Sequence, residues 1–255
     1  MTMTILLPPS ETKHPGGNDP AWPINTWALP SLTPLRQQTT DALINLSSNH
    51  DEALRTLKLG PKKIGEIEKN AQLKHAPTMP AIDRYTGVLY DVLEASTLDD
   101  TAREWLRDHV LVHTAPWGPI GALDGIPDYR MSATTTLPGV GPLRRAWSQY
   151  VTAALEAQHP EFIIDMRSEA YVRLGPVPTT THHVYVHVVT ETDDGTVRAL
   201  NHFNKKAKGE LVRALAQEQA NIATADELMR VAHTLGYVIR ATPEKNRVQL
   251  VAVAP

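Results

Sequence analysis

The apolar runs of this chain are short, and they end in proline, glycine or polar residues. Residues 4–7 run into Pro8-Pro9 and residues 162–165 run into a polar stretch, which is typical of short buried strands that enter loops. Between such runs, segments such as 204–217 carry apolar residues at helical spacing. No apolar run approaches the roughly 20 residues that cross a bilayer. The pattern therefore excludes a membrane-spanning protein and predicts a mixed α/β fold.

The order of the predicted elements favours one domain. Prolines at five positions between 15 and 34 exclude a helix or a central strand from the loop after the first strand. Helices are predicted over 35–73 with breaks at 47–51 and 60–61, and over 86–94, 99–107, 143–156, 204–217 and 226–235. Strands are predicted over 4–7, 109–113, 162–165, 183–190, 196–202, 236–240 and 248–253, with a hairpin turn at 193–195 and a long loop over 116–128. We expect a single compact α/β (α+β mixed) domain over 1–255 with a mixed sheet and a helical insertion at about 35–80.

Composition excludes several classes of protein. The 255 residues contain no cysteine, which removes disulfides, thiol nucleophiles and cysteine-ligated zinc or iron–sulfur sites. Hydrophobic residues make up 42% of the chain, enough for a core and against general disorder. The formal net charge of −3 excludes a generally basic nucleic-acid coat protein but permits local basic patches. The N-terminus lacks the basic residues of a secretory signal, so we expect a cytoplasmic protein.

A basic turn between two predicted helices is the first candidate for chemistry. Gly60 allows a tight reversal, and Pro61 suits the first position of the second helix, which is the layout of a helix-hairpin-helix. The amides at such a turn can meet a phosphate, and Lys58, Lys62 and Lys63 add charge. Residues 53–74 hold six basic and two acidic side chains. The alternative is an ordinary corner between helices with a solvated basic face.

Two further segments have similar features. Residues 137–142 resemble a helix-hairpin-helix turn in their letters, but the segment before them favours a strand, so we predict a loop that leads into a helix. At the start of another predicted helix, Lys205, Lys206 and Lys208 crowd the first turns, where the helix dipole favours anions. An anion site there is one interpretation, and a solvated charge run is the other.

Polar residues follow several of the predicted strands. Ser10 and Lys13 follow the first strand, the run Asp128-Tyr129-Arg130 follows the 116–128 loop, and residues 165–171 follow the strand at 162. Ligands of α/β proteins usually lie at the carboxyl ends of strands, so these residues could line one cleft. Ion pairs that only hold loops together would look the same in sequence.

Several other sites are not supported by the sequence. It contains no nucleophile elbow around Ser10 or Ser168, no H-E-x-x-H motif and no dinucleotide or Walker fingerprint. His183 and His187 share a face of a predicted strand but would lie roughly 13 Å apart, too far to hold one metal ion. We therefore predict no metal site and no cofactor.

Taken together, five segments resemble the YaaA peroxide-stress family, also known as DUF328 or UPF0246. They are LLPPSETK at 6–13, YTGVLY at 85–90, WG at 117–118 followed by IPDYR at 126–130, DMRSEAY at 165–171 and HFNKKAKG at 202–209. The resemblance implies a single α/β domain with a helix-hairpin-helix and a positively charged cleft. It also implies DNA binding and a role in limiting damage from hydrogen peroxide, linked to low free iron.

The resemblance carries over residue by residue. Ser10 and Lys13 fall on the first-loop pattern, Asp128, Tyr129 and Arg130 on the Tyr-Arg pattern, Ser168, Glu169 and Tyr171 on the Ser-x-x-Tyr pattern, and Lys205, Lys206 and Gly209 on the Lys-x-x-x-Gly segment. The chain departs from the family at Glu11-Thr12, at Pro116 and at the threonines 134–136, which leaves the shape of the cleft open.

Two functions follow as hypotheses. In the first, the protein binds DNA without sequence preference through Lys58, Gly60, Lys62, Lys63, Lys205, Lys206 and Lys208. In the second, it is an enzyme that acts on a nucleotide, nucleobase or DNA lesion. The enzyme's cleft would be lined by Ser10, Lys13, Arg130, Arg167, Ser168 and Asn204. The candidate catalytic residues are Lys13, Asp128, Tyr129, Glu169, Tyr171 and Lys206. The expected partners are DNA and a small anionic or nucleotide ligand.

Overall fold

Three adjacent parallel strands form the centre of this computed structural model, which describes residues 3–19, 23–191, 197–198 and 201–253. The strand β1 (Met3–Leu7) lies between β8 (Phe162–Asp165) and β3 (Val110–Thr114) and runs parallel to both. Every residue of β1 and β8 is buried. Continuous apolar runs are typical of parallel strands that are covered on both faces, so the short runs of the sequence became the innermost strands.

The main sheet continues from these strands to antiparallel edges. Its order is β11-β12-β9-β8-β1-β3-β4, where β9 and β12 continue the parallel set and β11 and β4 run antiparallel to their neighbours. A short strand, β10, pairs with β9, and the pairs β2–β5 and β6–β7 lie outside this sheet. The remaining strands are β2 (Met79–Pro80), β4 (Gly118–Gly121), β5 (Gly125–Ile126), β6 (Thr136–Leu137), β7 (Gly141–Pro142), β9 (His183–Glu191), β10 (Val197–Arg198), β11 (Val238–Ala241) and β12 (Arg247–Val253).

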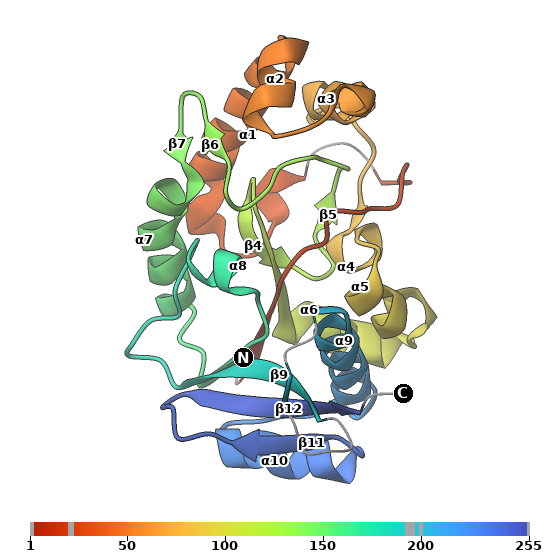
Figure 1. The fold of residues 1–255 in the computed structure, drawn as a ribbon, viewed down its shortest axis with the longest axis vertical. Coiled ribbons are helices and arrows are strands. Elements are labelled where there is room, and N and C mark those ends of the chain that lie inside the picture. The colour runs from red at the N-terminus through yellow and green to blue at the C-terminus, as the bar shows by residue number, and fades with distance from the viewer. Residues whose placement is uncertain (1–2, 20–22, 192–196, 199–200, 254–255) are drawn as a thin grey trace.

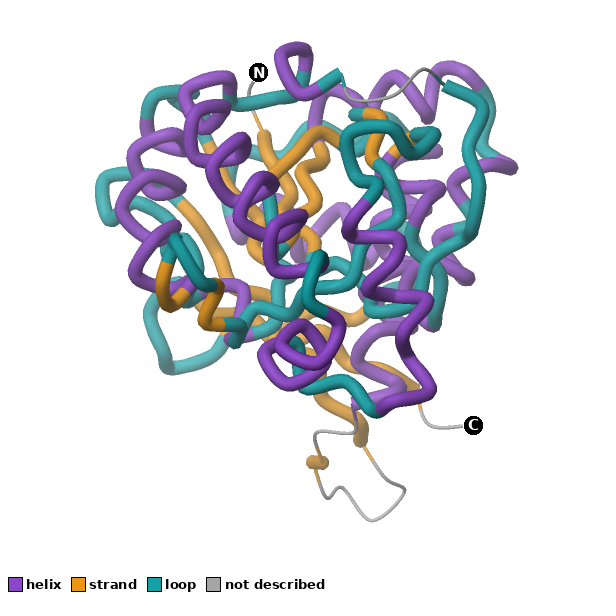
Figure 2. Tube along the Cα trace, turned by 90° about the horizontal axis from the view of Figure 1, so that it is seen from above, coloured by secondary structure: helices purple, strands orange, loops and turns teal. Residues whose placement is uncertain are grey.

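Helices surround the central strands (Figure 2). The α-helices are α1 (Thr33–Ser47), α2 (His50–Thr56), α3 (Ile64–Ala71), α4 (Ala81–Arg84), α5 (Val88–Leu93), α6 (Asp100–His109), α7 (Leu143–Glu156), α8 (Glu169–Val172), α9 (Asn201–Gln217) and α10 (Ala225–Thr234). Short 3-10 helices are η1 (Ile24–Thr26), η2 (Pro30–Leu32), η3 (Pro61–Lys63) and η4 (Ala95–Thr97). Helix α6 packs on β1 and β3, and α9 packs on β9 and β12. Helices α2 and α3 lie at the opposite end of the molecule from β11 and α10 (Figure 1).

Local sequence explains where these helices begin and which faces they bury. Asp99 caps α6, because its Oδ1 accepts a hydrogen bond from the amide of Ala102 at 2.8 Å. Along α7, Leu143, Trp147 and Val151 repeat every four residues and are buried, so one stripe of the helix faces the core. The observed α/β fold with a mixed sheet confirms the predicted fold class.

The structure differs from the sequence predictions in three segments. The predicted loop 116–128 is wrong, because it contains β4 and β5; Pro119 fits in β4 because that strand lies at the edge of the sheet. Residues 137–142 form a β-turn hairpin between β6 and β7 that leads into α7. The predicted turn at 193–195 lies outside the described residues, and α9 begins at Asn201, earlier than predicted. In the described part of the chain, no helix combines the length and apolar character needed to cross a bilayer.

Candidate functional site

A cleft lies at the carboxyl ends of β1 and β8. Its volume is about 640 Å³, and it is lined by the loops that follow these two strands, the segment 131–134, the face of β9 that carries Tyr185, and the first turns of α9. The two strands are parallel neighbours, so their ends meet at the same edge of the sheet. This topology brings Ser10, Ser168, Glu169, Tyr171, Asn204 and Lys205 together on the cleft wall.

A buried ion pair supports the cleft from beneath. Arg167 Nε and Nη2 donate to the two carboxylate oxygens of Asp165 at 2.9 and 2.6 Å, and Nη1 contacts His113 Nδ1 and the Gly175 carbonyl oxygen at 2.8 Å each. Arg167 is fully buried, so the structure places it under the cleft and not on its wall. Burial, together with the Arg167 charge, holds the pKa of His113 well below its usual range, so this imidazole is neutral.

Buried tyrosines support the loop that follows β1. The hydroxyls of Tyr85 and Tyr129 are hydrogen-bonded at 2.8 Å, and the Tyr90 hydroxyl donates to the Pro8 carbonyl at 2.7 Å, which fixes the loop after β1. Burial raises the pKa of Tyr129 and of Tyr171 above the ordinary value. These hydroxyls therefore stay protonated and can donate a hydrogen bond, but they are poor bases.

The predicted residues Lys13, Asp128 and Arg130 lie together beside the tyrosines. Lys13 Nζ lies 4.2 Å from the centre of the Tyr129 ring, and burial lowers its pKa to about 8. Asp128 Oδ2 forms an ion pair with Lys69 Nζ at 2.7 Å, and Arg130 Nη2 forms one with Glu11 Oε2 at 3.0 Å. These three side chains are thus engaged with neighbouring groups.

Helix α9 sends its basic residues in different directions. Lys205 is exposed at the cleft wall, whereas Lys206 is exposed elsewhere on the helix and pairs with Glu210 at 3.6 Å. Lys208 is 7% exposed, and its Nζ donates to the Met166 carbonyl at 2.9 Å. Burial lowers the pKa of Lys208 to about 8, against the opposing effect of Asp165. Asn204 also lines the cleft, and its buried Oδ1 has no hydrogen-bond partner in the described structure.

Smaller polar groups complete the cleft wall. Ser10 Oγ lies 3.3 Å from Thr12 Oγ1, and Glu169 pairs with Arg173 at 3.5 Å along α8. Ser168 precedes α8 and is exposed. In the described part of the chain, neither Ser10 nor Ser168 touches a base that would activate its hydroxyl.

The predicted basic turn lies between α2 and α3. The positive φ of the reversal belongs to Lys58, at 54°, whereas Gly60 is extended at φ −75°, so the predicted role of Gly60 in the reversal is wrong. Pro61 begins η3 as predicted. Lys58, Lys62 and Lys63 are exposed, and no ion pair in the described structure involves them. We name these three lysines the corner lysines.

The turn between α2 and α3 that carries the corner lysines, here called the corner, is tied to the cleft. Asn70 of α3 donates to the Arg130 carbonyl at 2.9 Å and accepts from the Arg130 amide at 2.8 Å. Asn70 is fully buried, so these two bonds are shielded from water. The Lys69–Asp128 ion pair lies one residue away on the same helix. The corner lysines and the cleft edge therefore stand on one connected framework.

Comparison with known proteins gives the family. The family model for peroxide stress protein YaaA matches residues 3–242. The chain belongs to this family. A UPF0246 protein of Corynebacterium glutamicum is 40% identical over 245 residues, covering 94% of this chain and 96% of its own length. A UPF0246 protein of Streptomyces coelicolor is 35% identical over 246 residues, covering 94% and 92%. An uncharacterized protein of Campylobacter jejuni is 28% identical over 221 residues, covering 85% and 86%. The resemblance stated from the sequence is thereby confirmed.

Tyr185 and His187 are among the cleft residues that sequence reasoning missed. They stand two residues apart on β9 and so share one face of the strand. The alternation of side chains along β9 was visible in the sequence. The sequence did not show which face of the strand packs against α9. Burial is the main cause of a lowered pKa at His187, and the positive charges of Arg247 and Lys208 lower it further. Among the described residues, no group of three or more histidine, aspartate or glutamate side chains could hold a metal ion.

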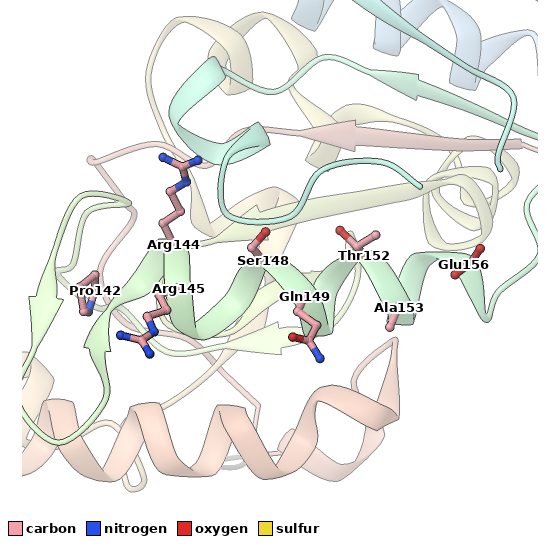
Figure 3. Close-up of a pocket in the computed structure, with 8 residues that line it drawn as sticks. All are labelled: Pro142, Arg144, Arg145, Ser148, Gln149, Thr152, Ala153 and Glu156. Carbon is pink, nitrogen blue, oxygen red and sulfur yellow. The ribbon is translucent and has the colours of Figure 1, made fainter. Parts of the chain in front are cut away.

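A second hollow, of about 670 Å³, lies along the exposed side of α7 (Figure 3). Arg144, Ser148 and Thr152 project from one side of the helix, and Arg145 and Gln149 from the other (Figure 3). The polar groups diverge, so this hollow does not assemble a site as the cleft does.

Proposed function

We propose that this protein acts in peroxide stress by binding DNA through its phosphate backbone, with the corner lysines as the principal contact. The observation that carries the proposal is that these three exposed cations lie within six residues and have no acidic partner in the described structure. A phosphate backbone would supply the missing charge, and binding would release counterions. Lysine side chains contact phosphates without reading bases, so the binding would not depend on sequence. Such a role places the protein in the cytoplasm, with the DNA.

The path of bound DNA would run from the corner toward the cleft. Asn70 and Lys69 hold α3 against the Asp128–Arg130 segment, which runs directly into the cleft-lining residues 131–134. Lys205 adds an exposed cation on the cleft wall. This arrangement supports a continuous contact instead of an isolated charged patch.

Charge reversal tests the corner. The variant Lys62→Glu with Lys63→Glu should lose at least tenfold in affinity for a fluorescent duplex, measured by anisotropy at low salt, because it removes two phosphate contacts and adds repulsion. The matched control reverses Lys245 and Arg230, which lie in or beside the β11–α10 end of the molecule, far from the corner (Figure 1). Both variants change the net charge equally. Equal loss of affinity in the two variants would contradict the proposal.

A second candidate function is an enzyme that acts on a nucleotide, nucleobase or DNA lesion in the cleft. The observation that favours it is that one cavity is lined both by a buried amine, Lys208, and by Asn204, whose Oδ1 has no hydrogen-bond partner in the described structure. A buried polar atom without a partner is uncommon and marks a place where a ligand could bind. A thermal-shift screen against nucleotides, bases and short duplexes should raise the melting temperature for one class only.

A further inference from the structure

Lys208 lines the cleft from a buried position. The side chain packs near Tyr185, with Nζ 5.6 Å from the ring centre, and Nζ donates to Met166 at 2.9 Å. Met166 and Tyr185 also line the cleft, so the amine lies among residues that a ligand would touch. One hydrogen bond anchors the nitrogen and leaves its remaining positions for a ligand.

The surroundings favour the neutral form of this amine. With a pKa of about 8, about one Lys208 in ten is unprotonated at pH 7, against about one in 3,000 for an ordinary lysine. The cause is burial, and Asp165, whose charge acts in the opposite direction, is already engaged by Arg167 through two hydrogen bonds. A neutral amine is a nucleophile, whereas an ammonium is not.

Two side chains beside Lys208 can orient a ligand. Asn204 lies one turn earlier on α9, so the two residues share a face of the helix, and its Oδ1 is without a partner in the described structure. His187 lies across the cleft on β9, and its lowered pKa keeps the imidazole neutral. Both can exchange hydrogen bonds with hydroxyl groups of a ligand.

We propose that Lys208 forms an imine with the aldehyde carbon of a phosphorylated sugar, with Asn204 and His187 positioning its hydroxyls and Lys205 contacting its phosphate. The inference deepens the second candidate function and does not depend on the corner lysines. The nitrogen lone pair of the neutral amine forms a bond to the carbonyl carbon, and one of the two nitrogen protons passes to the carbonyl oxygen to give a carbinolamine. The second nitrogen proton passes to the hydroxyl, which leaves as water, and a carbon–nitrogen double bond remains. One water is released for each imine.

The choice of ligand follows from the rim of the cleft. Lys205 is exposed, lines the same cavity, and has no ion pair in the described structure, so an anionic group suits it. The chemistry has two sources, a free sugar phosphate and the ring-opened deoxyribose of an abasic site in DNA. A cavity of about 640 Å³ has room for a sugar phosphate.

Other lysines lack this combination. Burial also lowers the pKa of Lys13 to about 8, but its Nζ lies over the Tyr129 and Tyr85 rings and Lys13 is not among the residues that line the cleft. Lys206 is exposed and paired with Glu210. The nucleophile is therefore Lys208 and not either of the candidate catalytic lysines, Lys13 and Lys206.

Reductive trapping tests the inference. The full-length protein is incubated with sodium cyanoborohydride and one of three probes: deoxyribose 5-phosphate, deoxyribose, or a duplex with one abasic site. Peptide mapping by mass spectrometry then locates the adduct. We expect a single dominant adduct on Lys208, formed at least tenfold faster with deoxyribose 5-phosphate than with deoxyribose. Adduct from the abasic duplex alone would assign the ligand to DNA, and adduct from the free sugar phosphate would assign it to metabolites.

Variants separate chemistry from folding. Lys208→Met should lose the adduct by at least tenfold, and Lys245→Met, which removes an exposed lysine, should keep it. Mapping on the unmodified protein gives the answer even if Lys208→Met fails to fold. Adducts spread over surface lysines, or a dominant adduct on Lys205 or Lys206, would overturn the inference. Trapping of the free sugar phosphate together with unchanged DNA binding by the Lys62/Lys63 variant would refute the DNA-binding proposal and leave this one standing.

Discussion

Replacing Lys208 by methionine should make the protein more stable at neutral pH. In the folded state the pKa of Lys208 is about 8, and in the unfolded chain it returns to about 10.5. At 1.36 kcal/mol for each pKa unit, the buried ammonium costs the folded protein about 3 kcal/mol below pH 8. Methionine removes this cost but leaves the Met166 carbonyl without its hydrogen bond, a loss of about 1–2 kcal/mol. The net gain in free energy of unfolding at pH 7 is then about 1–2 kcal/mol.

The gain should vanish as the pH rises. Between pH 8 and 10.5 the unfolded chain binds a proton at this lysine that the folded protein does not, so the stability of the unmodified protein rises with pH relative to the variant. Between pH 7 and 9.5 the advantage of Lys208→Met should fall by about 2 kcal/mol. The other ionisable groups near Lys208, which include Asp165, Tyr185 and His187, are present in both proteins and largely cancel.

Urea unfolding at the two pH values, followed by tryptophan fluorescence, measures both quantities. The control Lys245→Met removes an exposed lysine and should show a difference that does not change with pH. A pH-independent difference for Lys208→Met, or a loss of stability at pH 7, would refute the reasoning. A more stable variant that no longer forms the adduct would show that the buried lysine is kept for function at a cost in stability.

The remaining predictions concern the framework and the corner. Arg167→Met leaves Asp165 buried without its partner and should lower the free energy of unfolding by about 3–5 kcal/mol, measured by urea titration; a loss below 1 kcal/mol would contradict the buried ion pair. Gly209→Ala drives a methyl group into the Leu89 carbonyl oxygen, so α5 and α9 must separate, and we expect a loss of about 1–3 kcal/mol and a lower melting temperature. An unchanged melting temperature would show that the two helices can part freely. Lys62→Ala should reduce the slope of log affinity for DNA against log salt by about 1, and a slope equal to that of the unmodified protein would remove Lys62 from the interface.

Much of the fold could be predicted because its signals are local. The apolar runs at 4–7 and 162–165 became β1 and β8, and the break at 60–61 became the start of η3. The edge strand β4 was missed, because a strand that contains Pro119 looks like a loop until its pairing with β3 is known. Its partner β3 lies directly before it in the chain, so the pairing is local, and Pro119 is what hid it in the sequence.

The sequence by itself determined that polar residues follow the central strands and that lysines cluster at the start of α9 and at the corner. Only the tertiary structure decided the role of each charge. Lys205, Lys206 and Lys208 lie within four residues and look equivalent in sequence, yet the packing of α9 on β9 exposes the first two and buries the third. Arg167 likewise lies under the cleft because Asp165 and His113 hold it there. Burial depends on contacts between distant segments, and burial is what changes a pKa or leaves a charge free to bind.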